Sequence, residues 1–199
     1  MRSPVPGYVV SVILVGIGVG LLTYPLSNAW RYTAAQSRMA EAFATTVETS
    51  DTPAATDTVP ADPAVAVPAA GEPVAKLTIP KLGLDTIVLS GTGRSVLKSG
   101  PGHYRETPLP GEPGNSAIAG HRTMYGQPFR YLDKLSAGDE IVALTRAGRF
   151  VYKVVEVKSV LPTDVSVIDP TDETFLTLTA CDPPGSAARR LVVKARLSD

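Results

Sequence analysis

The chain has 199 residues, 44% of them hydrophobic, and a formal net charge of zero at pH 7. This length suits one folded domain with appended segments, and the balanced charge argues against a nucleic-acid-binding protein, which would carry a clustered basic surface. The single cysteine, Cys181, excludes an internal disulfide and any zinc site built from several cysteines.

The first predicted element is a membrane-spanning helix at residues 8–26. Residues 3–30 include no charged side chain, and a helix over 8–26 approaches the thickness of a bilayer at about 1.5 Å per residue. The alternative is a cleaved signal peptide. Its apolar region would be shorter, however, and the nearest Ala-x-Ala site, at 42–44, lies well beyond the run. We therefore expect an uncleaved, single-pass signal anchor.

Residues 27–73 are predicted to form an acidic tether. From 44 to 73 the sequence is mostly Ala, Thr, Val, Pro and Asp, without a Leu or Ile to build a core, and no Lys or Arg occurs between Arg38 and Lys76. This composition is typical of an extended, disordered chain. Such a tether would reach on the order of tens of ångströms from a membrane.

The remaining residues, 74–199, are predicted to form one all-β domain. Short β-type runs alternate with Gly- and Pro-rich turns, and only 95–99 and 127–135 are typical of short helical turns. Many short strands of this kind favour a closed barrel or a sandwich. The expected strands are 76–79, 86–89, 116–119, 140–145, 150–160, 175–180 and 191–197, with a hairpin at 146–149.

Three reactive side chains lie at the ends of three different predicted strands. Cys181 is followed by Asp-Pro-Pro-Gly, which must end its strand, His121 follows a strand through a glycine, and Arg190 opens the last strand. A thiol, an imidazole and a guanidinium are the nucleophile, the acid/base and the oxyanion partner of cysteine acyl-transfer enzymes. The pattern therefore indicates a catalytic site at one rim of the domain.

Each of these residues also has an ordinary structural interpretation. A lone cysteine is more often a small buried hydrophobe than a nucleophile. His103 competes with His121 for a catalytic role, and spacing alone does not choose between Arg189 and Arg190. A non-catalytic, membrane-tethered β-domain that binds wall or protein partners would need none of them.

Two segments resemble the sortases, the membrane-anchored cysteine transpeptidases of Gram-positive bacteria. They are 177–181 (Thr-Leu-Thr-Ala-Cys), with an Arg nine residues later, and 117–123 (Ala-Ile-Ala-Gly-His-Arg-Thr). The resemblance covers 74–197 and implies an eight-stranded β-barrel that needs no metal or other cofactor. It implies that His121, Cys181 and Arg190 are catalytic, with Arg190 preferred to Arg189 because it stands immediately before the closing strand. It also implies that 1–7 are cytoplasmic and that the barrel lies outside the cell membrane.

Within the family the likeness is greatest to class E, through 120–126 (Gly-His-Arg-Thr-Met-Tyr-Gly) and 100–104 (Gly-Pro-Gly-His-Tyr). Class E enzymes favour a Leu-Ala-x-Thr-Gly sorting signal over Leu-Pro-x-Thr-Gly. The likeness implies cleavage of secreted proteins between Thr and Gly, followed by transfer to an amine of a lipid II-like peptidoglycan precursor. Tyr125, Thr179 and Ala180 are the expected substrate contacts, although Ala180 stands where the family usually has Thr.

A pilin-polymerising sortase is the nearest enzymatic alternative. Those enzymes usually carry a lid with an Asp-Pro-aromatic motif before the barrel. The only Asp-Pro dipeptide ahead of this barrel, at 62–63, is followed by Ala64. The sequence therefore favours a class E enzyme over a pilin polymerase.

Overall fold

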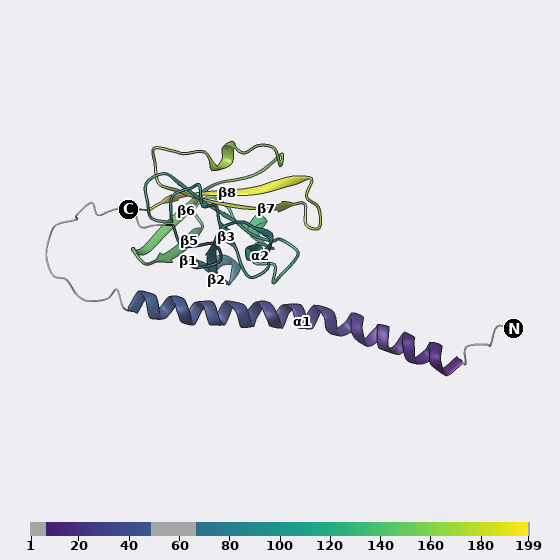
Figure 1. Ribbon diagram of the computed structural model, residues 1–199. Coiled ribbons are helices and arrows are strands. Elements are labelled where there is room, and N and C mark those ends of the chain that lie inside the picture. Colours follow the sequence, from purple (N-terminus) through teal and green to yellow (C-terminus); the bar gives the residue numbers. More distant parts are fainter. Residues whose placement is uncertain (1–6, 49–66, 199) are drawn as a thin grey trace.

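The computed structural model describes residues 7–48 and 67–198, as one long helix and a closed β-barrel (Figure 1). The predicted N-terminal segment up to residue 6 and the part of the predicted tether at 49–66 lie outside the described residues. The strands are β1 Pro73–Ile79, β2 Leu84–Ser90, β3 Gly102–His103, β4 Asn115–Ala119, β5 Glu140–Thr145, β6 Gly148–Val160, β7 Phe175–Asp182 and β8 Arg189–Leu197. The helices are α1 Gly7–Glu48 and α2 Arg94–Leu97, with short 3-10 turns η1 Pro80–Leu82, η2 Leu132–Lys134 and η3 Ser166–Ile168.

The barrel closes in the order β1-β2-β3-β4-β7-β8-β6-β5. The predicted closed, eight-stranded barrel is thus confirmed, and so is the β5–β6 hairpin, in which Thr145 pairs with Gly148. Two of the pairs of adjacent strands, β2–β3 and β4–β7, are parallel, and the other pairs are antiparallel. The parallel pairs require long connections, which are absent from hairpin-only barrels.

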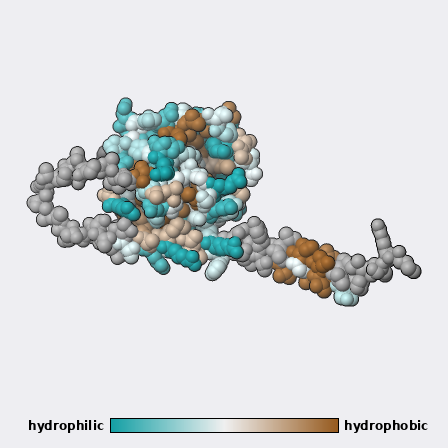
Figure 2. Space-filling view, viewed as in Figure 1, coloured by the Kyte–Doolittle hydropathy of each residue, from teal (hydrophilic) through white to brown (hydrophobic). Residues whose placement is uncertain are grey.

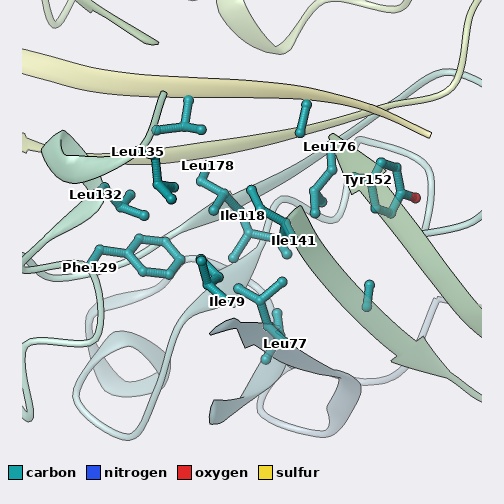
Figure 3. Close-up of a cluster of buried hydrophobic side chains, with 14 of the residues drawn as sticks. Leu77, Ile79, Ile118, Phe129, Leu132, Leu135, Ile141, Tyr152, Leu176 and Leu178 are labelled. Atoms are coloured by element: carbon teal, nitrogen blue, oxygen red, sulfur yellow. The ribbon is translucent and has the colours of Figure 1, made fainter. Parts of the chain in front are cut away.

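Apolar side chains from alternate strand positions fill the barrel (Figure 3). Inward-facing residues of β1, β4, β5 and β7 meet there, and burial of each large side chain contributes roughly 1.5–3 kcal/mol. Tyr152 is fully buried, and its hydroxyl accepts a hydrogen bond from Gly111 N–H at 2.8 Å. The fully buried members labelled in Figure 3 include Leu77, Ile79, Ile118, Phe129, Leu132, Ile141, Leu176 and Leu178.

Helix α1 continues far beyond the predicted membrane span, and the structure differs here from the predicted tether. Residues 27–48 are helical, and the last third of α1 packs on β2 (Figure 1). Phe43, only 3% exposed, joins Ile87, Leu89 and Val96 in a second small core. The reason is a stripe of side chains along one face of the helix, because Tyr32, Gln36, Met39, Ala40 and Phe43 recur at helical spacing.

Within the residues that the structure describes, no helix contains a stretch both long and apolar enough to cross a bilayer.

His103 is fully buried in β3, away from solvent. Its Nε2 lies 2.8 Å from the carbonyl oxygen of Pro108, and its Nδ1 has no hydrogen-bond partner among the described residues. Burial lowers the pKa of His103 below its usual value, because a charged imidazolium would lose hydration there. His103 is therefore a neutral structural residue of the barrel wall.

We predict that His103 makes folding sensitive to acid. The unfolded chain takes up a proton at this residue near pH 6.5, whereas the folded protein does so only at lower pH, so its contribution to stability is lost as pH falls below about 6.5. Urea unfolding of wild type and His103→Gln should show a stability difference that is largest at pH 7.5 and shrinks toward pH 5.5. A difference that stays constant over this range would contradict the prediction.

Candidate active site

Strand register brings His121, Cys181 and Arg190 to one level at one rim of the barrel. The parallel ladder of β4 and β7 pairs Ala119 with Thr179, and Gly120 N–H donates to the carbonyl of Thr179 at 3.0 Å. His121 and Cys181 each follow this last pair by two residues. On the other side of β7, Cys181 pairs directly with Arg190 of β8.

Arg190 directs its guanidinium to the thiol of Cys181. The distance from Nη1 of Arg190 to Sγ is 3.7 Å, and the same nitrogen donates to the carbonyl of Ala187 at 3.3 Å. Arg189 instead donates through Nε to the Ser159 hydroxyl at 2.9 Å and through Nη2 to the Ser159 carbonyl at 2.6 Å. The thiol is free and half-buried. The geometry therefore places Arg190, rather than Arg189, beside Cys181.

His121 is half-buried in the loop that follows β4, and burial lowers its pKa below the usual value. A neutral ring at pH 7 can accept a proton from a thiol. Its backbone carbonyl accepts a hydrogen bond from Phe129 N–H at 3.1 Å. The preceding Gly120 is required by packing, because a Cβ there would lie only 2.4 Å from Cδ2 of Phe129. The Phe129 ring thus supports the backbone that carries His121.

Arg122 is a site residue to which the sequence analysis assigned no role. Its side chain is only 3% exposed, and it pairs with Asp182 and, at 2.9 Å, with Asp133. Arg122 follows His121 in sequence and Asp182 follows Cys181, so this ion pair joins the two chain segments one residue beyond the reactive groups. The sequence does contain a signal for this ion pair, because Arg122 directly follows His121 and Asp182 directly follows Cys181.

Asp182 completes a polar network behind the thiol. Its second carboxylate oxygen accepts a hydrogen bond from the Ser159 hydroxyl at 2.6 Å. The bond from Ser159, together with those from Arg122, lowers the pKa of Asp182, so the carboxylate stays charged at neutral pH. Ser159 also accepts the bond from Arg189, which gives that arginine a structural role.

We predict that Arg122→Met destabilises the protein by about 1–2 kcal/mol, because it removes a buried guanidinium that pairs with the partly exposed carboxylates of Asp133 and Asp182. The matched control is Arg130→Met in the same loop, where the side chain is exposed and the cost should stay below about 0.5 kcal/mol. Chemical denaturation measures both. Equal losses for the two variants would show that the Arg122 ion pair contributes nothing specific.

The three predicted substrate contacts lie in different environments. Tyr125 is half-exposed, and its ring centroid is 5.1 Å from that of His121. Thr179 is 6% exposed, and its hydroxyl lies 3.2 Å from the hydroxyl of Tyr104. Ala180 is 3% exposed and packs in the main core. Of the three, only Tyr125 presents part of its side chain to solvent.

Comparison with known proteins gives consistent matches. A family model described as a sortase domain matches residues 77–198. Sortase SrtE1 of Streptomyces coelicolor is 37% identical over 143 residues, which cover 64% of this chain and 41% of that protein. This chain spans less than two thirds of the length of the first curated relatives that it matches.

Solved structures agree with these sequence matches. The structure of sortase E from Streptomyces avermitilis is 42% identical, with a TM-score of 0.60, over 66% of this chain and 91% of that chain. Sortase E1 from Streptomyces coelicolor, solved with a tripeptide in the active site, is 33% identical, with a TM-score of 0.61, over 65% of this chain and 90% of that chain. Both likenesses extend over about two thirds of this chain.

Proposed function

The chain belongs to the sortase family, and on this premise we propose that it is a cysteine transpeptidase that acts on secreted proteins bearing a sorting signal. The proposed signal is Leu-Ala-x-Thr-Gly, cleaved between Thr and Gly, and the proposed acceptor is an amine of a peptidoglycan precursor. The likeness to class E sortases supports this choice of signal. The observation that carries the proposal is the strand register, which brings His121, Cys181 and Arg190 together at one rim of the barrel.

In the first half-reaction the neutral His121 ring accepts the thiol proton of Cys181, and the thiolate attacks the carbonyl carbon of the signal's Thr. Negative charge develops on the carbonyl oxygen, and Arg190, already directed to the sulfur, donates hydrogen bonds to it. His121, now an imidazolium, donates its proton to the departing Gly amine. The peptide bond breaks, and a thioester to Cys181 remains.

In the second half-reaction an amine of the precursor attacks the thioester. His121 accepts a proton from the attacking nitrogen and returns one to the sulfur, so a new amide forms and the thiol is regenerated. The tripeptide bound in the active site of the Streptomyces coelicolor relative supports a peptide as the first substrate. In this proposal Tyr125, beside His121, contacts the signal. Thr179 and Ala180, which precede Cys181 on β7, are also proposed to contact it.

We further propose that residues 8–26 anchor the protein in the cell membrane as a single span, with the barrel outside the cell. The support is the apolar surface of the first part of α1 (Figure 2). More than half of each of these apolar side chains is exposed, which suits contact with lipid rather than water. They are Tyr8, Val12, Ile13, Leu14, Val15, Ile17 and Val19.

We expect Cys181→Ala to abolish cleavage, because no other group in the proposed mechanism can form the thioester. Mass spectrometry of a peptide library that contains Leu-Ala-x-Thr-Gly and Leu-Pro-x-Thr-Gly, incubated with the protein and an amine, reports the bond cleaved and the preferred signal together. Full activity of Cys181→Ala would refute the proposal and favour a domain that only binds partners. Substrate joined to substrate, instead of to the added amine, would favour a pilin polymerase.

The two neighbouring arginines provide a matched pair of variants. Arg190→Ala should lower kcat/KM by about 10²–10³, the usual effect of losing an oxyanion donor. Arg189→Ala removes an equal charge but only bonds to Ser159, so its rate should stay near that of wild type. The same peptide assay measures both, and equal losses would show that Arg190 has no special role.

A further inference from the structure

We propose that helix α1 is part of the active-site architecture: Tyr32 and Gln36 are positioning residues that hold the loop of residues 120–127, and with it His121 and Tyr125. This rests on the proposed function, because it concerns the same site. It assigns a catalytic purpose to the segment that the sequence predicted to be a tether.

The first contact is between Tyr32 and Gly126. Gly126 lies immediately after Tyr125, and a Cβ on Gly126 would lie 2.3 Å from Cδ1 of the Tyr32 ring. The Tyr32 hydroxyl lies 3.3 Å from Oγ1 of Thr86 on β2. The ring thus contacts the barrel at its hydroxyl end, while its carbons Cγ, Cδ1 and Cε1 lie beside Gly126.

The loop needs such support because its backbone is strained. Tyr125, Gly126 and Gln127 have φ values of 48°, 75° and 53°, three consecutive residues in the left-handed region. This region is unfavourable for residues with a side chain, and it persists only where the surrounding structure enforces it. The atoms nearest to a Cβ built on Gly126, in the middle of this turn, all belong to the Tyr32 ring.

Gln36, one helical turn after Tyr32, fixes α1 to the barrel. Its side-chain oxygen accepts from Ile87 N–H at 2.7 Å, and its nitrogen donates to the carbonyl of Ser99 at 2.8 Å. Strand β3 pairs with β2 only at Leu89 and Ser90, so the amide of Gln36 takes the place of a strand partner at Ile87. Buried backbone groups left without such a partner would be costly, so the position of the helix is well defined.

Gln36 is also connected to the loop through Ser99 and its neighbour Lys98. Ser99, which accepts its hydrogen bond, follows Lys98, and the Lys98 ammonium lies 5.9 Å from the centroid of the Tyr125 ring. The Tyr125 ring is therefore within reach of both Lys98 and His121. Helix α1 is therefore connected to Tyr125 in two ways. Tyr32 contacts the neighbouring Gly126, and Gln36 bonds to Ser99 beside Lys98.

The test uses the whole 199-residue chain and the Leu-Ala-x-Thr-Gly peptide assay, with rates normalised to the amount of Cys181 that a thiol reagent titrates. Tyr32→Ala should lower kcat about ten-fold or more, because His121 would still be present but no longer held in the geometry that the reaction needs. Tyr32→Phe keeps the ring over Gly126 and should restore most of the rate. Hydrogen exchange of residues 120–127 should accelerate in Tyr32→Ala, while exchange in β7 and β8 stays unchanged.

Trp30→Ala is the matched control, because Trp30 is an aromatic residue of the same helix and is 72% exposed. Its rate should equal that of wild type. If Tyr32→Ala does not fold, Gln36→Leu, which keeps the side-chain bulk and removes the hydrogen bonds, provides the same test.

The outcomes separate the two proposals. A wild-type protein that does not cleave the peptide refutes the proposed function. A wild-type protein that cleaves, with Tyr32→Ala as active as Trp30→Ala, refutes only the role of α1. Unfolding of the barrel in both Tyr32→Ala and Gln36→Leu also overturns it, because α1 would then be part of the general core rather than a support of the loop.

Discussion

The parallel pairing of β4 with β7 is the constraint on which the site depends, because its register brings His121 level with Cys181. Buried polar contacts fix the register at both ends of the pair. At the first end Thr177 donates to the side-chain oxygen of Asn115 at 2.7 Å, and at the last end Arg122 pairs with Asp182. A slip of one residue would break both contacts and turn the core residues of one strand outward. The strand pairing therefore brings the chain segments that carry His121 and Cys181 to the same rim of the barrel.

The sequence predicted the chemistry and most strands, but not the register. Cys181 and His121 could be expected at one rim because each follows the end of a predicted strand. The short strand β3 and the parallel pairings were not predicted, because they join segments far apart in the chain and leave no local pattern. The choice of Arg190 over Arg189 came from the family resemblance alone. Adjacent residues of a strand point to opposite faces, and spacing does not reveal which face meets the thiol.

The clearest failure of the sequence analysis is the stretch from 27 to 48. The absence of Leu and Ile after residue 43 predicts a chain with nothing to bury, whereas the stripe of side chains before it belongs to a helix that packs on the barrel. Tertiary contacts decide the outcome, because Phe43 and Gln36 find complementary partners on β2 that no local pattern reveals. One side-chain amide that satisfies a free strand edge is invisible in the sequence, yet it fixes the helix to the barrel.

A continuous helix changes how the proposed anchor would hold the enzyme. A flexible tether lets a domain explore a wide volume, whereas α1 is unbroken from the apolar run through Tyr32 to Glu48. From residue 26, where the proposed span ends, to Tyr32 the rise is only about 9 Å at 1.5 Å per residue. The loop that Tyr32 contacts would then lie close to the membrane surface at a fixed height. A precursor whose amine is carried on a lipid would meet such a site by diffusing within the membrane plane. The enzyme would not have to move toward the membrane or away from it.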